Sequence, residues 1–268
     1  MHRALPATRL RNLAALCATW SVALVAVGAV LVVRPGMGDA FSYWRTWHEA
    51  PYASVPYPPP ALLLFAPAIV LPSSAFVVLW IGVLVAAGAW LLWPLPIRLR
   101  IPIFIALTST FTFGNVATLL AVPLALAPRW PVAWSIIGWT KITPAVGAIA
   151  LVRQRRWADI ASLAAVSVLV GLIALVLAPD LVAAWVAAMH KSTWVGDLFL
   201  PGLIPFSVPV AVRLPIAVAI AWFGASRPWT LAIAAAFSTP DLSIATCGLL
   251  AAIPRLQQPS SGGSTGAA

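Results

Sequence analysis

The sequence has few charged residues and very few acidic ones. Only 8% of its 268 residues are charged, and six are Asp or Glu, whereas an ordinary soluble domain has roughly 25% charged residues. Hydrophobic residues make up 62% of the chain, and a water-exposed surface cannot be built from what remains. The composition therefore excludes a soluble protein and predicts an integral membrane protein.

Cysteine and histidine are also scarce. Cys17 and Cys247 each lie in an apolar segment and share no metal-ligand spacing with the three histidines. We expect structural thiols that fill space in these segments, and we expect no metal and no cofactor. A phosphate-binding loop, a dinucleotide fingerprint and an internal repeat are all missing, so function is expected to come from a membrane-embedded site.

In place of charge, the chain has long uncharged runs. No charged residue falls between Arg11 and Arg34, Glu49 and Arg98, Arg100 and Arg129, or Asp159 and Asp180. Each run reaches the ~20 residues that a membrane-spanning helix needs. Ala, Leu, Val and Ile without strict alternation favour helices over barrel strands. We predict an all-α polytopic bundle of about 7–10 transmembrane or re-entrant helices with no soluble domain.

The positive charges indicate an orientation. The 16 basic residues give a formal net charge of +10 and lie mostly at the ends of hydrophobic runs, which membrane orientation and lipid phosphates explain better than nucleic acid. Arginines in residues 1–11 predict a cytoplasmic N-terminus. The following apolar segment, Asn12–Val33, is too long for the core of a signal peptide. Residues 34–59 then form an extracytoplasmic loop.

Two apolar stretches each allow two interpretations. Leu71–Ser74 interrupts Pro60–Trp93, and Gly114–Asn115 interrupts Ile101–Ala127. Each stretch is either two helices joined by a turn or one kinked helix. If both stretches fold alike, the basic cluster Arg153–Arg156 is cytoplasmic either way.

The rest of the chain returns to the outer face once more. A helix over Trp157–Leu177 places a second extracytoplasmic loop at residues 180–200. Two proline-interrupted apolar segments then complete a transmembrane domain over residues 12–255. We expect residues 256–268 to be a disordered polar tail, because Ser and Gly dominate them.

The first outer loop contains the most varied chemistry of the sequence. Two of the six acidic residues lie in Gly38–Ala50 together with aromatic and basic side chains. At helical spacing Tyr43 and Trp47 share one face, and Trp44 and His48 share another. This pattern is typical of an amphipathic helix at the membrane interface.

Asp39 is the strongest catalytic candidate. It follows Gly36 and Gly38 directly after a membrane helix, where a carboxylate at the rim of a cavity would act as a general base. The alternative is that Asp39 caps the N-terminus of a helix over Phe41–Ala50.

Isolated charges within later apolar segments are the next candidates. An ammonium at the depth of Lys141 is costly unless it faces a cavity or a partner, so Lys141 either binds phosphate or extends to the interface. Arg213 and Asp241 are similar charges, or they mark short loops. His190, Lys191 and Asp197 of the second outer loop either complete a phosphate and sugar site or are solvated.

Several short motifs follow one another along the chain in an order that is typical of one protein family. They are Gly38-Asp39, Tyr43, Tyr57-Pro58-Pro59, Ala66-Pro67, Leu71-Pro72, Trp80, Gly114-Asn115, Lys141-Ile142-Thr143-Pro144, Arg155-Arg156-Trp157 and Ser238-Thr239-Pro240-Asp241. In this order they resemble the polyprenol-phosphate-dependent glycosyltransferases of the GT-C type. The similarity is to the GT87 (DUF2029) family of bacterial mannosyl- and arabinofuranosyltransferases, and it spans roughly Leu13 to Ile253. Asn115 stands where that family commonly has Gln.

The resemblance implies a GT-C-like bundle and a specific reaction. A sugar, with mannose as the first guess, would pass from a polyprenyl-phosphate donor to a lipid or glycan acceptor at the outer face of a bacterial plasma membrane, with inversion. Asp39 would be the base. The resemblance and the local chemistry give the substrate- and phosphate-binding candidates Tyr43, Arg45, His48, Tyr57, Lys141, His190 and Lys191.

Two other function classes stay open from the residues. In a transporter or flippase, the isolated intramembrane charges would mark the pathway of the cargo. In an inactive or accessory membrane protein, the same scaffold would be kept without chemistry.

Overall fold

The computed structural model describes residues 7–33, 36–49, 52, 57–191, 210–239, 243 and 245–258. All regular structure within these ranges is helical, so the all-α prediction is confirmed. A helix pairs its backbone N–H and C=O groups inside one segment, which is the arrangement that an apolar environment demands.

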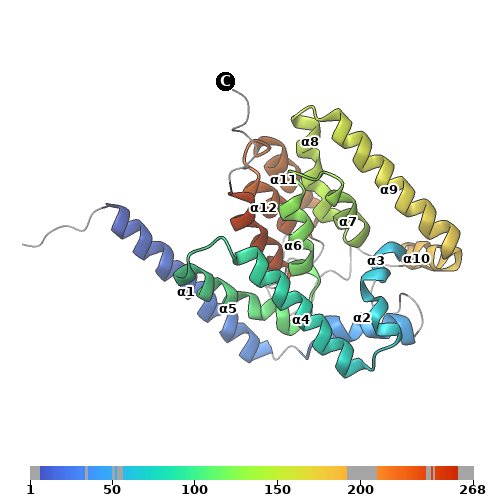
Figure 1. Cartoon of the computed structure of the whole chain (residues 1–268), viewed down its shortest axis with the longest axis horizontal. Coiled ribbons are helices and arrows are strands. Elements are labelled where there is room, and N and C mark those ends of the chain that lie inside the picture. Colours follow the sequence, from blue (N-terminus) through green and yellow to red (C-terminus); the bar gives the residue numbers. More distant parts are fainter. Residues whose placement is uncertain are drawn as a thin grey trace, which may run out of the picture.

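The first half of the chain contributes one long helix, one short helix across an end of the molecule, and several apolar helices (Figure 1). They are α1 (Ala7–Val33), α2 (Gly38–His48), α3 (Pro59–Leu62), the 3-10 helix η1 (Leu63–Ile69), α4 (Ser73–Leu92), α5 (Ile97–Phe113), α6 (Ala117–Leu126) and α7 (Ala133–Thr140). α1 packs along α5, and α4 packs against both α5 and α6.

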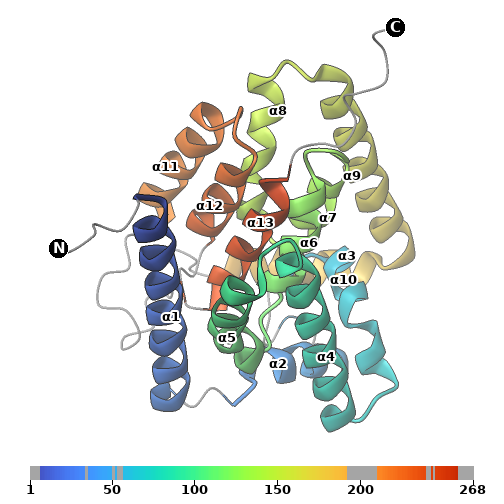
Figure 2. The ribbon, with the colours of Figure 1, turned by 60° about the vertical axis from the view of Figure 1, so that its left-hand side comes forward.

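The second half supplies the other side of the bundle (Figure 2). Its helices are η2 (Thr143–Ala148), α8 (Ile149–Arg153), α9 (Trp157–Leu177), α10 (Pro179–Lys191), α11 (Val210–Phe223), α12 (Trp229–Ser238), η3 (Ala245–Ala252) and α13 (Ile253–Leu256). η3 packs against α6 and α12. Fully buried small residues such as Ala121, Ala235 and Ala252 let these backbones approach closely.

Both interrupted stretches fold as two helices. Pro72 is the N-cap of α4 and separates it from η1. Gly114 ends α5 with a φ of 71°, a left-handed conformation that glycine adopts at no steric cost. The single kinked helix is therefore wrong at both places, because proline or a left-handed glycine ends the regular hydrogen bonding there.

Three described stretches are long and apolar enough to cross a membrane: Arg11–Val32, Ser73–Leu92 and Trp157–Leu177. The shorter apolar helices have 10–17 residues. At about 1.5 Å per residue such helices are shorter than the ~30 Å hydrocarbon core. The expected seven to ten transmembrane or re-entrant helices thus remain a prediction. None of the residues of α9 is buried, and the apolar surface of this helix suits contact with lipid.

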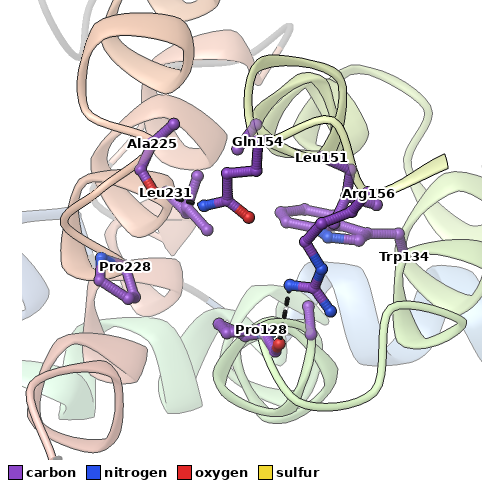
Figure 3. A pocket seen from close by; sticks show the side chains of 11 residues that line it. Pro128, Trp134, Leu151, Gln154, Arg156, Ala225, Pro228 and Leu231 are labelled. Carbon is purple, nitrogen blue, oxygen red and sulfur yellow. Dashed lines mark hydrogen bonds between the residues drawn. The ribbon is translucent and has the colours of Figure 1, made fainter. Parts of the chain in front are cut away.

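Arginine gathers at one end of the bundle, which we call the arginine end. The turns after α4, α6, α8 and α11 meet there with the end of α13. Three hydrogen bonds join these turns. Arg255 Nη2 donates to Trp90 O (2.7 Å), Arg156 Nη1 donates to Pro128 O (3.1 Å), and Gln154 Nε2 donates to Ala225 O (2.5 Å). The residues of the last two bonds are labelled in Figure 3. The described arginines at this end are Arg98, Arg100, Arg129, Arg153, Arg155, Arg156, Arg227 and Arg255.

Acidic residues gather at the opposite end, which we call the site end. Among the described residues, Asp39 and Glu49 belong to α2 and its C-terminus, and Asp180 lies in the first turn of α10. α3 contacts α9 and α10, so the end of the first predicted outer loop lies near the start of the second. The fourth described acid, Asp159, bonds to Arg156 at the arginine end (2.5 Å).

Two expectations near the ends of the chain need adjustment, and a third falls mostly outside the described residues. α1 begins at Ala7 rather than at Asn12, because the preceding arginine-containing turn also adopts helical structure. The predicted tail lies outside the described residues from 259 onward, and α13 ends at Leu256. Cys17 and Cys247 are free and exposed, so neither fills interior space as expected.

Candidate functional site

Helix α2 carries the first-loop candidates and lies across the site end. Its N-cap is Met37, which has a φ of 55° and makes no capping bond through its side chain. Asp39 lies two residues later, inside the first turn, so the N-cap interpretation of Asp39 is wrong. A carboxylate in the first turn still interacts favourably with the helix dipole.

The aromatic pattern of α2 agrees with the helical spacing. Trp44 and His48 stack with ring centroids 3.9 Å apart, and Trp44 Nε1 donates to Leu71 O at 2.9 Å. On the other face Tyr43 is buried and Trp47 packs against the apolar core. These contacts attach α2 to the turn between η1 and α4 and fix which face points inward.

Gly114 allows the turn between α5 and α6 to lie directly against α2. A Cβ atom at this position would be 2.7 Å from Ala40 Cβ and 2.9 Å from the Ala40 backbone nitrogen, closer than real Cβ contacts. Trp80 Nε1 donates to the Gly114 carbonyl oxygen at 2.8 Å and holds the turn in place. Ala40, the residue after Asp39, therefore packs against the turn that leads into α6.

Asn115 connects this turn to the candidate base. Its side-chain Nδ2 donates to Asp39 Oδ2 at 2.6 Å, while its Oδ1 accepts from the backbone N–H of Ala117 at 2.9 Å. The second bond fixes the orientation of the amide, so that the donor side faces the carboxylate. Asn115 is 4% exposed, which limits competition from water.

Tyr43 is the second residue of the site that α2 supplies. Its ring stacks on Phe65 at 4.2 Å between centroids and meets the edge of Trp80 at 5.4 Å. Its hydroxyl oxygen accepts from the backbone N–H of Val116 at 3.3 Å and lies 3.4 Å from the hydroxyl of Tyr57. The two tyrosines are thus paired at the N-terminal end of α6.

The environment of Tyr43 keeps its hydroxyl protonated. Burial raises the pKa of Tyr43 well above its usual value of 10.0, and the neighbouring Tyr57 and Asp39 raise it further. A phenolate would be costly there because it would be desolvated next to a carboxylate. Tyr43 therefore offers a neutral O–H group.

Lys141 reaches the same group of side chains from α7. It is the C-cap residue of α7, in extended conformation, and its Nζ lies 6.0 Å from the centroid of the Tyr57 ring. Asp39, Tyr43, Tyr57 and Lys141 are therefore linked through successive contacts, although they come from three separate segments: α2, the residues just before α3, and the end of α7. The structure brings these four predicted residues together.

Arg45 and His48 do not join this group. Arg45 Nε lies 3.5 Å from Glu49 Oε1 in an exposed pair, and His48 Nδ1 contacts Trp44 O at 3.0 Å on the outer surface of α2. They are two and five residues from Tyr43, which places them on other faces of the helix. Their assignment as phosphate-binding residues has no support from these contacts.

The second-loop candidates are described only in part. The backbones of His190 and Lys191 belong to the last turn of α10, whereas their side chains and Asp197 lie outside what the structure describes. Because α10 contacts α3, the start of this predicted loop lies close to the segment that follows Tyr57.

Arg213 is a polar residue whose role the sequence left open. It is 2% exposed within α11, and its Nη1 donates to Phe237 O at 2.9 Å and Thr239 O at 2.7 Å. Ser238 Oγ in the same segment donates to Thr143 O at 2.8 Å. The end of α12 is thus tied both to a buried cation and to the turn that carries Lys141. Asp241 lies outside the described residues.

The environments of Asn115 and Trp47 are not visible in the sequence. Nothing in the residues around Asn115 indicates its bond to Asp39. The Nε1 group of Trp47 is buried and has no hydrogen-bond partner among the described residues. Its position one turn beyond Tyr43 was visible in the spacing, but whether this donor is satisfied depends on tertiary packing.

A small cavity elsewhere is a poor candidate for substrate. It has a volume of about 30 Å³ and lies at the arginine end, where Gln154 and Arg156 project between α6, α8 and α12 (Figure 3). That volume accommodates one or two water molecules and no sugar. The chemistry is therefore better placed at the site end, which offers a carboxylate, two phenols, an amide and an ammonium.

Comparisons with known proteins identify no relative of this chain. No model of a protein family matches the chain, and no curated protein or solved structure is significantly similar to it.

Proposed function

We propose that this protein is a membrane glycosyltransferase that uses a polyprenyl-phosphate-linked sugar as donor, with Asp39 as the general base. One observation carries the proposal. Asp39 and Tyr43 of α2 lie with Tyr57 and Lys141 at one end of the bundle, and Asn115 donates a hydrogen bond to Asp39. These residues combine a base with a cation, as the transfer requires.

The proposed reaction is a single displacement. The acceptor hydroxyl oxygen attacks the anomeric carbon, a new C–O bond forms, and the bond from that carbon to the phosphate oxygen breaks. The acceptor proton passes to the Asp39 carboxylate, and polyprenyl phosphate leaves with the bonding electrons. Attack from the face opposite the leaving group inverts the anomeric configuration.

Lys141 suits the leaving group in this scheme. Charge develops on the phosphate as the glycosidic bond breaks, and a nearby ammonium stabilises it. The neutral Tyr43 hydroxyl and the hydroxyl of Tyr57 are suited to sugar hydroxyls or phosphate oxygens. Trp47 Nε1, which has no partner in the described part of the chain, is a further donor on the same face of α2. His190 and Lys191 remain candidates for the phosphate.

The distribution of charge supports an orientation in the membrane. Arginine-rich ends of membrane proteins face the cytoplasm, so we propose that the site end lies at the outer surface. The donor then keeps its polyprenyl chain in the bilayer while its headgroup meets a polar acceptor at the interface. We accordingly assign the chain to a bacterial plasma membrane, with short apolar helices completing a GT-C-like bundle beside the three long ones.

The decisive experiment measures sugar transfer by Asp39→Asn beside a matched control. Membranes with wild-type protein, Asp39→Asn or Glu49→Gln receive radiolabelled mannosyl polyprenyl phosphate, followed by other polyprenyl-phosphate sugars, with lipid and glycan acceptors. Glu49 is the other carboxylate of this region, and it is exposed and paired with Arg45. Removal of a general base lowers the rate about 10²–10⁴-fold.

We expect product from the wild type and from Glu49→Gln, with loss confined to Asp39→Asn. Equal product from Asp39→Asn would exclude Asp39 as the base. If no donor sugar gives product with folded wild-type protein, the transferase proposal fails and an accessory role becomes the better one. If the unmodified donor moved from one leaflet of the vesicle bilayer to the other and no sugar was transferred, a flippase would be favoured instead.

A further inference from the structure

The arginine end combines strong positive charge with exposed indole rings. Eight described arginines lie at this end, together with one described acidic residue, Asp159, which bonds to Arg156. Trp93, Trp130 and Trp157 are 67%, 64% and 61% exposed at this end. Exposed tryptophan beside arginine is typical of the headgroup layer of a membrane, where the ring has an apolar body and a polar edge.

Three arginines at this end lie over tryptophan rings. The guanidinium carbon of Arg255 is 4.1 Å from the centroid of Trp90, that of Arg100 is 4.7 Å from Trp93, and that of Arg153 is 5.8 Å from Trp222. Such stacking holds a planar guanidinium in a fixed orientation and leaves its edge available for an oxyanion.

Arg255 is the best oriented of the three. Its Nε and Nη2 atoms donate to Trp90 O at 3.0 and 2.7 Å. Its remaining nitrogen, Nη1, bonds to no described residue. α13 contacts both α4 and α6, and Arg129 is an exposed residue just after α6, so its positive charge lies near that of Arg255. No acidic side chain in the described part of the chain pairs with either arginine.

Two arginines held near each other without an acid form a natural anion site. Arg129 and Arg255 repel each other, and an anion between them removes that repulsion and adds charge-assisted hydrogen bonds. The neighbouring Trp90 and Trp130 contribute apolar surface that a free phosphate ion would not use. A phosphate attached to acyl chains uses both features.

We propose that Arg129 and Arg255, with Trp90 and Trp130, bind the headgroup phosphate of an anionic phospholipid. The inference depends on membrane insertion of the chain and is independent of glycosyl transfer. Orientation of the protein alone requires positive charge at this end, but it does not require a guanidinium fixed on an indole ring beside a second arginine. The site therefore distinguishes one lipid class from another.

The test compares retained lipid in purified full-length protein. Wild type, Arg129→Gln, Arg129→Gln/Arg255→Gln and Arg45→Gln are placed in mixed micelles with equal phosphatidylglycerol and phosphatidylcholine, and native mass spectrometry counts bound lipids. Arg45 is the matched control, because it is an exposed arginine at the opposite end. A separate arm adds millimolar inorganic phosphate.

We expect the wild type and Arg45→Gln to retain phosphatidylglycerol preferentially. The double variant should lose that preference by roughly tenfold or more, as removal of two interfacial charges implies. Arg129→Gln should show a partial loss, and because its side chain makes no described hydrogen bond, this variant separates lipid binding from folding. Unchanged preference in Arg129→Gln and in a folded double variant overturns the proposal. Equal loss in Arg45→Gln, or full displacement by inorganic phosphate, overturns it as well.

Discussion

Asn115 donates a hydrogen bond to Asp39 across 76 residues of sequence, at 2.6 Å. The same amide accepts a bond from Ala117 N–H, so its orientation is set by the first turn of α6. Asn115 thus acts as a positioning residue for the proposed base.

Replacing Asn115 should weaken catalysis through Asp39. We expect Asn115→Leu to lower kcat roughly ten- to hundredfold, the value of a hydrogen bond to a charged group, with little change in KM. Asn115→Asp keeps an acceptor for Ala117 N–H and serves as a folding control, but it adds a like charge and should also be slow. An unchanged kcat, or a loss that appears only as a rise in KM, would contradict this role.

Gly114 should not tolerate a side chain. Gly114→Ala places a methyl group against Ala40 and demands a positive φ, which costs about 1–3 kcal/mol before any movement of α2. We expect a lower thermal midpoint in detergent and loss of transfer activity. Gly82→Ala is the control, because a Cβ there meets no atom within 4 Å. It should leave both measurements unchanged or raise stability slightly. Similar behaviour of the two variants would argue against the close contact.

Tyr43 should make the folded protein sensitive to alkali. The pKa of Tyr43 is raised above 10.0 by burial, then by Tyr57 and Asp39, so its contribution to stability is complete below about pH 10 and is lost as pH rises through the higher folded value. The thermal midpoint of the wild type should therefore fall above pH 10 more steeply than that of Tyr43→Phe. Parallel curves from pH 8 to 11 would refute the buried, neutral phenol.

Arg213 should be required for stability rather than for chemistry. Arg213→Gln removes bonds to the Phe237 and Thr239 carbonyl oxygens at the end of α12, and unpaired buried carbonyls cost about 2–4 kcal/mol in total. Scanning fluorimetry in detergent should show a clear drop in the midpoint. Arg227→Gln, at an exposed residue, should change stability by no more than about 0.5 kcal/mol. A midpoint for Arg213→Gln as high as that of Arg227→Gln would contradict this role.

The helices and their breaks were predictable because they depend on local chemistry. Uncharged apolar runs predicted helical structure, and Pro72 and Gly114 predicted where two stretches are interrupted. The stack of Trp44 on His48 follows from a spacing of four residues in a helix. The same rule also places Arg45 and Tyr43 on different faces of α2.

The tertiary partners were not predictable from local patterns. Asn115 reaches Asp39 only because α6 begins against α2, and the burial of Arg213 depends on how α11 meets α12. Apolar composition also fails to fix helix length: residues 59–69 form a short helix although they lie in the same uncharged run as the long helix α4. Such breaks depend on which polar backbone groups find partners after the helices pack.

The contact between Asp39 and Asn115 also sets an order of assembly during synthesis. Their separation of 76 residues means that Asp39 leaves the ribosome well before its partner, by about 4–15 s at ~5–20 residues per second. During this interval the carboxylate lacks the amide that orients it. The contact that shapes the proposed site therefore forms only after α6 has docked against α2.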